Sequence, residues 1–101
     1  VDMIDLSPAT TRRVTATFRD EDRAEAARLL TEECAERIPL WRDLSPAGLD
    51  RIRIAAVKLS EGDMAKLRYA ISVANVDWRD VLVAAGFAND IAAHERWMPN
   101  G

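Results

Sequence analysis

Residues 45–74 read SPAGLDRIRIAAVKLSEGDMAKLRYAISVA, and they give the strongest indication of the fold. Ser45 and Pro46 are typical of a helix start, because serine caps free N–H groups and proline at the first position has no N–H to leave unpaired. Gly62 then separates two apolar stripes with helical spacing. The stripes are Leu49, Ile52, Ala56 and Leu59, followed by Met64, Leu67, Ile71 and Ala74. We therefore predict two helices that fold back on each other at Gly62 and share one core.

The N-terminal part repeats this start signal at Ser7 and Pro8. A helix from there to about Phe18 places Val14 and Phe18 one turn apart on its buried face. Residues 13–18 also alternate between polar and apolar types, as a strand does, so the strand stays open as an alternative.

A further helix is expected from Glu21 to about Ile38, capped by Asp20. Pro39 ends it, since proline donates no hydrogen bond and disfavours a helical residue before it. Apolar residues recur along this segment with helical spacing. They are Ala26, Ala27, Leu29, Leu30, Cys34 and Ile38.

Two pairs of polar residues after position 59 have the spacing of a capping box. Ser60 and Asp63 precede the stripe that begins at Met64, while Asp77 and Asp80 are expected to open a short fifth helix. Gly86 is typical of the left-handed residue that follows a helix C-terminus, so this helix should end there.

A sixth short helix is expected over residues 90–97, capped by Asn89. Ile91 and Ala92 would seal the core. Trp97 lies about 120° further around the helix, so we expect it to fold back over the edge of the bundle.

These signals together predict an all-α fold: a compact single-domain bundle of five to six helices with short connections, spanning residues 1–101. The composition, 49% hydrophobic and 31% charged, is that of a globular chain. Residues 1–6 are expected to be flexible, with residues 1–2 as a possible cloning remnant. The chain has neither an apolar run of about 20 residues nor a visible signal peptide, so we expect no membrane association.

The charge balance disfavours nucleic acid as a partner. Fourteen Lys and Arg residues against seventeen Asp and Glu give a net charge of −3, and phosphate contacts require cations. Residues 81–97 resemble a helix-turn-helix in outline, but carboxylates in the second helix would oppose the phosphates. The single cysteine, Cys34, excludes an internal disulfide and favours a cytoplasmic location.

Candidate catalytic and metal-binding groups are few. Asp90 and His94 stand four residues apart, but a zinc site needs three or four ligands, so a surface carboxylate–imidazole pair is the favoured interpretation. Cys34 and His94 could form a nucleophile and base. The place of Cys34 in an apolar stripe instead favours an inert core residue. We therefore expect no catalytic residue, no metal and no cofactor.

Aromatic and basic residues offer the better candidates for contact with a partner. Trp78, Arg79, Trp97 and Met98 are the expected interaction residues, because tryptophan and arginine are favoured as interface anchors. A structural role for Trp78 in packing remains the alternative. A basic group that could hold a phosphate, or simply form a solvated charged face, consists of Arg12, Arg13, Arg19 and Arg23.

Three runs near the C-terminus resemble a group of short bacterial proteins of unknown function. They are KLSEGDM (58–64), DWRDVLVAAGF (77–87) and WMP (97–99), and the likeness covers mainly residues 58–99. The resemblance implies a bacterial, cytosolic, single-domain protein. It carries over no catalytic or binding residue.

The leading functional hypothesis is a small, non-enzymatic protein-interaction module that binds a partner protein or forms a homodimer. The chain has no glycine-rich phosphate loop, no ligand cluster and no plausible triad to suggest an enzyme. One alternative is a small-molecule binder or small enzyme whose pocket includes Trp41, Trp78, Arg79 and His94. Another is a weak nucleic-acid binder.

Overall fold

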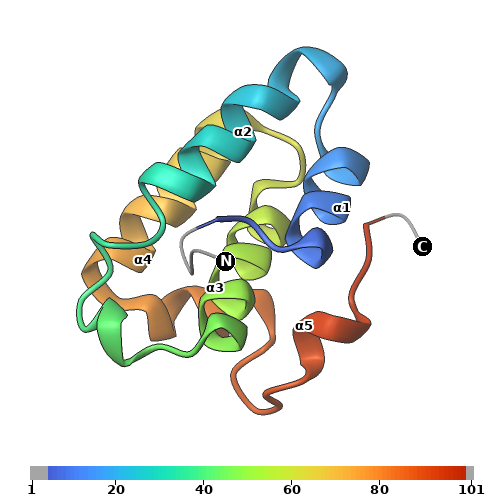
Figure 1. Ribbon diagram of the computed structural model, residues 1–101. Coiled ribbons are helices and arrows are strands. Elements are labelled where there is room, and N and C mark those ends of the chain that lie inside the picture. Colours follow the sequence, from blue (N-terminus) through green and yellow to red (C-terminus); the bar gives the residue numbers. More distant parts are fainter. Residues whose placement is uncertain (1–4, 100–101) are drawn as a thin grey trace.

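The computed structural model describes residues 5–99 and contains only helices and turns in that range, which confirms the all-α prediction. The helices share one hydrophobic core. No helix in that range is long and apolar enough to cross a membrane. The elements are α1 (Pro8–Thr17), α2 (Asp20–Glu32), the 3₁₀ turn η1 (Trp41–Asp43), α3 (Pro46–Ser60), α4 (Met64–Ala85) and α5 (Ala93–Arg96) (Figure 1).

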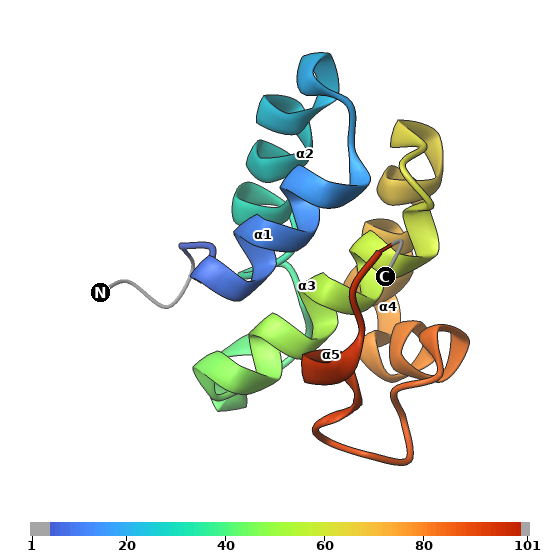
Figure 2. The ribbon, with the colours of Figure 1, turned by 90° about the vertical axis from the view of Figure 1, so that its right-hand side faces the viewer.

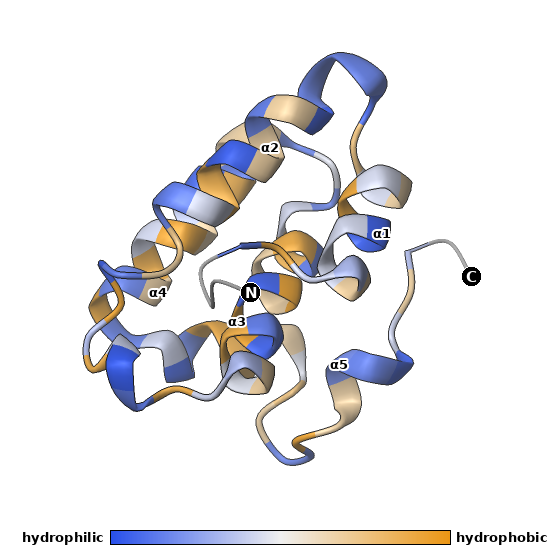
Figure 3. Ribbon diagram, viewed as in Figure 1, coloured by the Kyte–Doolittle hydropathy of each residue, from blue (hydrophilic) through white to orange (hydrophobic). Residues whose placement is uncertain are grey.

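Helix α3 is the central element of the bundle. It contacts α1, α4 and α5, while α2 packs against both α1 and α4. Figure 2 shows α1 and α2 as one pair above α3, with α4 and α5 on its other sides. Hydrophobic and hydrophilic positions alternate along α2 (Figure 3), as expected of a helix with one buried face.

The two predicted stripes do face one core. Six of their eight members are buried, and Leu59 and Met64 are half-buried and packed against the core. Helix α3 is buried beyond its predicted stripe, because Ile54 and Val57 are also almost inaccessible and Arg53 is only 1% exposed. A central helix has neighbours on several sides, so a single stripe describes it incompletely.

The predicted serine caps are confirmed at α1 and α3. The Ser7 and Ser45 hydroxyls each accept a hydrogen bond from a backbone N–H three residues on, at 3.1 and 3.0 Å. The capping box at Ser60 was a wrong prediction: Asp63 caps α4 alone, whereas the Ser60 hydroxyl donates to the carbonyl of Val57 (2.6 Å).

Gly62 occupies the turn between α3 and α4 with φ at +84°. A Cβ at this position would lie 2.8 Å from the carbonyl oxygen of Thr17, at the end of α1. Glycine is therefore required twice, for its left-handed backbone and for the close approach of α1. This turn brings α4 back along α3, as predicted.

The predicted second helix is too long and starts one residue late. Asp20 is already its first helical residue, with Arg19 as the cap, and the helix ends at Glu32 rather than near Ile38. Cys34 and Ile38 are still buried, at 0% and 1% exposure. The apolar spacing thus identified the buried residues correctly, although Cys34 and Ile38 lie in the irregular segment after α2 and not in a helix.

The predicted fourth and fifth helices are the two halves of a bent α4. The bend lies at Asp77, whose φ and ψ of −155° and 105° are non-helical. A carboxylate oxygen of Asp77 accepts from the backbone N–H of Arg79 at 3.0 Å, so it caps the second half. The helix ends before Gly86, whose φ is +81°, as predicted.

The C-terminal segment differs most from its prediction. Helix α5 is a single turn capped by neither Asn89 nor any other side chain. Ile91 is 78% exposed, because it lies in the irregular connection before α5 and not on a buried helix face. Ala92 is half-buried, while Trp97 does pack against the core.

Arg13 explains how this short segment is held in place. Its guanidinium donates to the carbonyls of Trp97 (3.1 Å), His94 (3.3 Å) and Glu95 (3.2 Å). A fourth bond reaches the carbonyl of Ala9 in α1 (2.9 Å). One buried side chain therefore takes the place of the helical hydrogen bonds that a longer α5 would have made.

The N-terminal residues are held by a second buried arginine. Arg53 donates to the carbonyl of Asp5 at 3.1 Å, and Leu6 packs against the core. Residues 5 and 6 thus make contacts with the bundle, and their flexibility stays a prediction. For residues 1–4, including the suggested cloning remnant at 1–2, the prediction lies outside the described residues.

Candidate functional site

The four predicted interaction residues do not form one surface. Trp78 and Trp97 are half-buried and packed against the core, as the packing alternative for Trp78 anticipated. Arg79 is exposed, but its guanidinium binds the Asp77 carboxylate through two contacts of 3.0 Å. Met98 is 42% exposed.

The alternative pocket was expected to join Trp41, Trp78, Arg79 and His94. His94 lines a cavity of about 290 Å³, which includes none of the other three. Trp41 lies in η1, just before the start of α3, and is packed against the core. The cavity at His94 therefore does not bring the four residues together as predicted.

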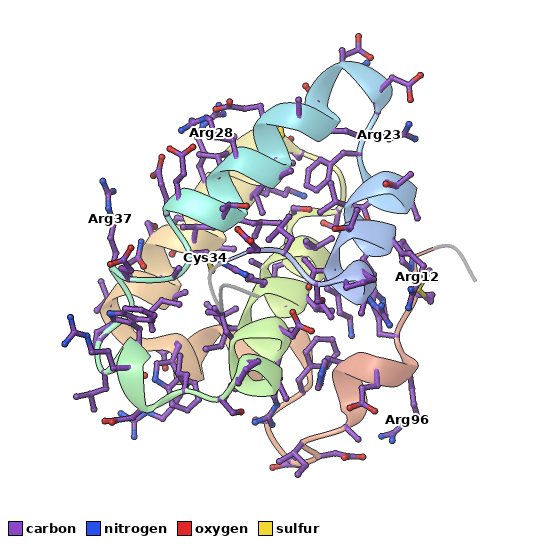
Figure 4. The ribbon with its side chains drawn as sticks, in the orientation of Figure 1. Arg12, Arg23, Arg28, Cys34, Arg37 and Arg96 are labelled. Atoms are coloured by element: carbon purple, nitrogen blue, oxygen red, sulfur yellow. The ribbon has the colours of Figure 1, made fainter. Side chains whose placement is uncertain are left out.

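Three of the four arginines in the predicted basic group are engaged by other groups of the protein. Arg13 is buried and donates to four carbonyls, as described above. Arg23 donates to the carbonyl of Phe18 (3.0 Å) and pairs with Asp20, while Arg19 lies within 4 Å of acidic residues in the first turn of α2. Of this group only Arg12, labelled in Figure 4, has no hydrogen-bond or ion-pair partner among residues 5–99.

Asp90 and His94 do not pair, either as metal ligands or as surface neighbours. Asp90 caps the turn before α5 by accepting from the N–H of Ala92 (2.9 Å), and it pairs with Arg96. His94 is instead 5% exposed, with its ring 6.4 Å from the ring of Phe87. The single turn of α5 is also too short to act as the reading helix of a helix-turn-helix.

The His94 ring is a buried, incompletely satisfied group. Its Nδ1 is buried without a hydrogen-bond partner in the described part of the chain. Burial lowers the pKa of His94 below its usual 6.5. Arg51 and Arg13 act in the same direction, while Glu95 and Asp50 oppose them. The folded protein therefore holds this imidazole in its neutral form near neutral pH.

We expect His94 to make stability fall on mild acidification. The unfolded chain takes up a proton near pH 6.5, whereas the folded chain does so only at lower pH. The free energy of unfolding should thus decrease as the pH falls through about 6.5 and level off at the folded pKa. Urea denaturation of wild type and His94→Gln between about pH 7.5 and 5.5 measures this. A wild type that gains stability relative to the variant in acid would contradict it.

Cys34 is buried beside Arg53 at the point where the chain leaves α2 (Figure 4). It is 0% exposed, and burial raises the pKa of its thiol to about 12. Burial thus keeps the thiol protonated at neutral pH, which disfavours a nucleophilic role. The expectation of a buried core cysteine is confirmed.

Cys34 should therefore react with a thiol reagent only after unfolding. We expect native labelling to be slower than labelling in urea by on the order of a hundredfold or more. The release of chromophore from an aromatic disulfide reagent gives both rates. Equal rates would show that the segment after α2 opens readily.

An apolar groove of about 540 Å³ lies at the bend of α4. The end of α3 and both halves of α4 form its walls, and Tyr69, Val73 and Val81 are among the side chains that line it. Its rim carries three charged residues. These are Glu61, Lys66 and Asp80.

The sequence contained a signal for this groove. Tyr69, Val73 and Val76 are spaced four and three residues apart, so they form a second apolar stripe beside the buried one. Val73 is half-buried against the core, whereas Tyr69 and Val76 remain 72% and 79% exposed, because no other element within residues 5–99 covers them. A helix with two apolar stripes and only one buried indicates a surface for binding.

Within residues 5–99, no group of three or more His, Cys, Asp or Glu side chains is arranged to hold a metal ion. The recesses of the described residues include the apolar groove on α4 and the small cavity beside His94. Comparison of the chain with protein-family models, with curated proteins and with solved structures gave no significant match.

Proposed function

We propose that the protein is a non-enzymatic interaction module that pairs with a second copy of itself through the bend of α4. The observation that carries this proposal is the apolar groove beside Tyr69. Six large hydrophobic side chains are exposed in residues 5–99, and three of them lie on α4, namely Tyr69, Val76 and Val83. Covering these side chains removes apolar surface from water, which is the main driving force for association.

The charges on the groove rim favour a second copy as the occupant. Lys66 lies before the bend, where it pairs with Glu61 of the same copy (2.9 Å), and Asp80 lies after the bend. In a two-fold pairing with antiparallel α4 helices, Lys66 of one copy lies near Asp80 of the other, and the reverse contact follows by symmetry. A self-complementary surface of this kind requires no other partner.

The cellular setting belongs to the same proposal. A buried, unpaired cysteine is compatible with a reducing compartment, so we take the protein to act in the cytoplasm. The resemblance over residues 58–99 supports a bacterial source.

Sedimentation velocity over a hundredfold range of concentration tests the pairing. The wild type is expected to shift from monomer to dimer, and Tyr69→Glu should remain monomeric because a buried carboxylate in the groove is unfavourable. Ile91→Glu is the matched control, since Ile91 is similarly exposed (78%) but lies outside α4. A monomeric wild type at the highest concentration, or loss of the dimer in Ile91→Glu alone, would refute the proposal.

Charge reversal tests the antiparallel arrangement separately. Lys66→Glu and Asp80→Lys should each weaken the dimer, whereas the double variant should restore it, because the opposite charges again face each other across the two-fold axis. If the double variant is weaker than either single variant, the copies do not pair in this orientation.

A further inference from the structure

A second, polar cavity lies between α1, α3 and α5. Its volume is about 290 Å³, close to the lower limit of known ligand pockets, so it suits a ligand of only a few heavy atoms. The lining residues that matter most are Arg12, Arg13, Asp50, Ile54, His94 and Glu95. They come from three segments that are far apart in the sequence.

Several polar atoms at this cavity are not satisfied by the protein. Arg12 has no hydrogen-bond or ion-pair partner among residues 5–99. Asp50 uses one carboxylate oxygen to accept from the Thr10 hydroxyl (3.1 Å) and leaves the other without a described partner. His94 is only 5% exposed, and neither of its ring nitrogens has a hydrogen bond within residues 5–99.

The two ring nitrogens of His94 are not equivalent. Nδ1 is completely buried without a described partner, whereas Nε2 is not among the buried unpaired atoms, so Nε2 is the ring nitrogen left for a ligand in the cavity. A hydrogen bond to Nε2 leaves Nδ1 unpaired.

The charges of the cavity select the class of ligand. Two arginines, Arg12 and Arg13, line the cavity together with two acidic residues, Asp50 and Glu95, and the Arg13 guanidinium is already bonded to four carbonyls. A simple anion would be repelled by the carboxylates and a simple cation by the arginines, whereas a small molecule that carries both charges is attracted at both ends.

We propose that this cavity binds a small zwitterion of the α-amino acid type. The ligand carboxylate binds Arg12, whose planar guanidinium matches a carboxylate with two parallel hydrogen bonds. Its ammonium binds the free oxygen of Asp50, and a short side chain lies along Ile54. The Nε2 of His94 provides the remaining hydrogen bond without adding a charge.

The ring signals of His94 provide a direct readout, because the chain has one histidine. We would titrate the wild type with L-alanine, with acetate and with ethylamine, and follow the ring Hε1 resonance by NMR. L-Alanine is expected to shift this resonance saturably, and at lower concentration than either singly charged probe. A tighter response to acetate or to ethylamine, or no saturable shift with L-alanine, would overturn the proposal.

Two variants connect the response to the named charges. Arg12→Gln and Asp50→Asn should each raise the Kd for L-alanine by about tenfold, the effect of one charge-assisted hydrogen bond. Asp50→Asn keeps an oxygen for the Thr10 hydroxyl, and Arg42→Gln is the control because Arg42 is exposed and lies outside the cavity. If Asp50→Asn does not fold, Arg12→Gln decides alone, and an unchanged Kd in that variant would refute the site. The outcome is independent of dimer formation through α4.

Discussion

Replacing Arg53 with alanine is expected to lower the free energy of unfolding by about 4 kcal/mol. The side chain is 1% exposed, and its guanidinium donates to the carbonyls of Cys34 and Asp5, both at 3.1 Å. The variant leaves a cavity in the centre of the bundle and removes hydrogen bonds from two carbonyls. It also releases two segments from α3, the N-terminal residues and the irregular chain after α2.

Arg53→Met separates the polar contribution from the packing contribution. Methionine fills most of the same volume but has no donor, so we expect about half of the loss seen with alanine. Arg42→Ala is the matched control, because Arg42 is exposed and its loss should cost less than about 0.5 kcal/mol. Chemical denaturation gives all three values. A methionine variant as stable as wild type would show that the hydrogen bonds to the carbonyls make no net contribution to the free energy of unfolding.

Leu67→Ala is expected to cost about 2–5 kcal/mol, the range observed for leucines deleted from close-packed cores. Leu67 is 0% exposed and lies on the buried stripe of α4. The neighbouring helices cannot collapse freely into the space, because α3 is fixed on its other sides by α1 and α5.

Leu40 offers a control of the same residue type. It is 76% exposed, in the connection before η1, so Leu40→Ala should change stability by less than about 0.5 kcal/mol. Because both variants lose the same atoms, the difference between them measures burial alone. Similar losses at the two positions would mean that the buried stripe of α4 is assigned to the wrong face.

The parts of the fold that depend on neighbours in the sequence could be predicted. The Ser7 and Ser45 caps and the left-handed Gly86 are decided within one helical turn, so the local sequence contains the whole signal. The stripes in α3 and α4 are equally local, because they depend only on the helical repeat.

The end of α2 could not be predicted from that repeat. Cys34 and Ile38 continue the apolar spacing, but the Cys34 carbonyl accepts from Arg53 instead of a backbone N–H one turn on. The Thr31 hydroxyl also binds the carbonyl of Ala27 (2.8 Å), a side-chain contact that often bends helices. A long-range partner thus replaces the helical bond, and no local pattern reports it.

The polar cavity was hidden for the same reason. His94 was identified as chemically interesting, but its expected partner was Asp90, which is close in sequence. Apart from its neighbour Glu95, the charged groups that share its cavity are Arg12, Arg13 and Asp50, which lie more than forty residues away. Only the folded chain brings these charged groups next to His94. The spacing of residues in the sequence therefore identified His94 but not the cavity that it lines.

The two buried arginines also determine how this fold tolerates evolutionary change. Arg13 and Arg53 donate to main-chain carbonyls, which every residue type possesses. Mutation of Trp97 or Cys34 therefore leaves the oxygen acceptor in place, whereas lysine cannot replace either arginine because it lacks the planar fork. Related sequences can therefore change the residues whose carbonyls accept these hydrogen bonds, while selection conserves only the two arginines that donate them. Invariant arginines at positions 13 and 53 would then identify the fold in sequences with little other similarity.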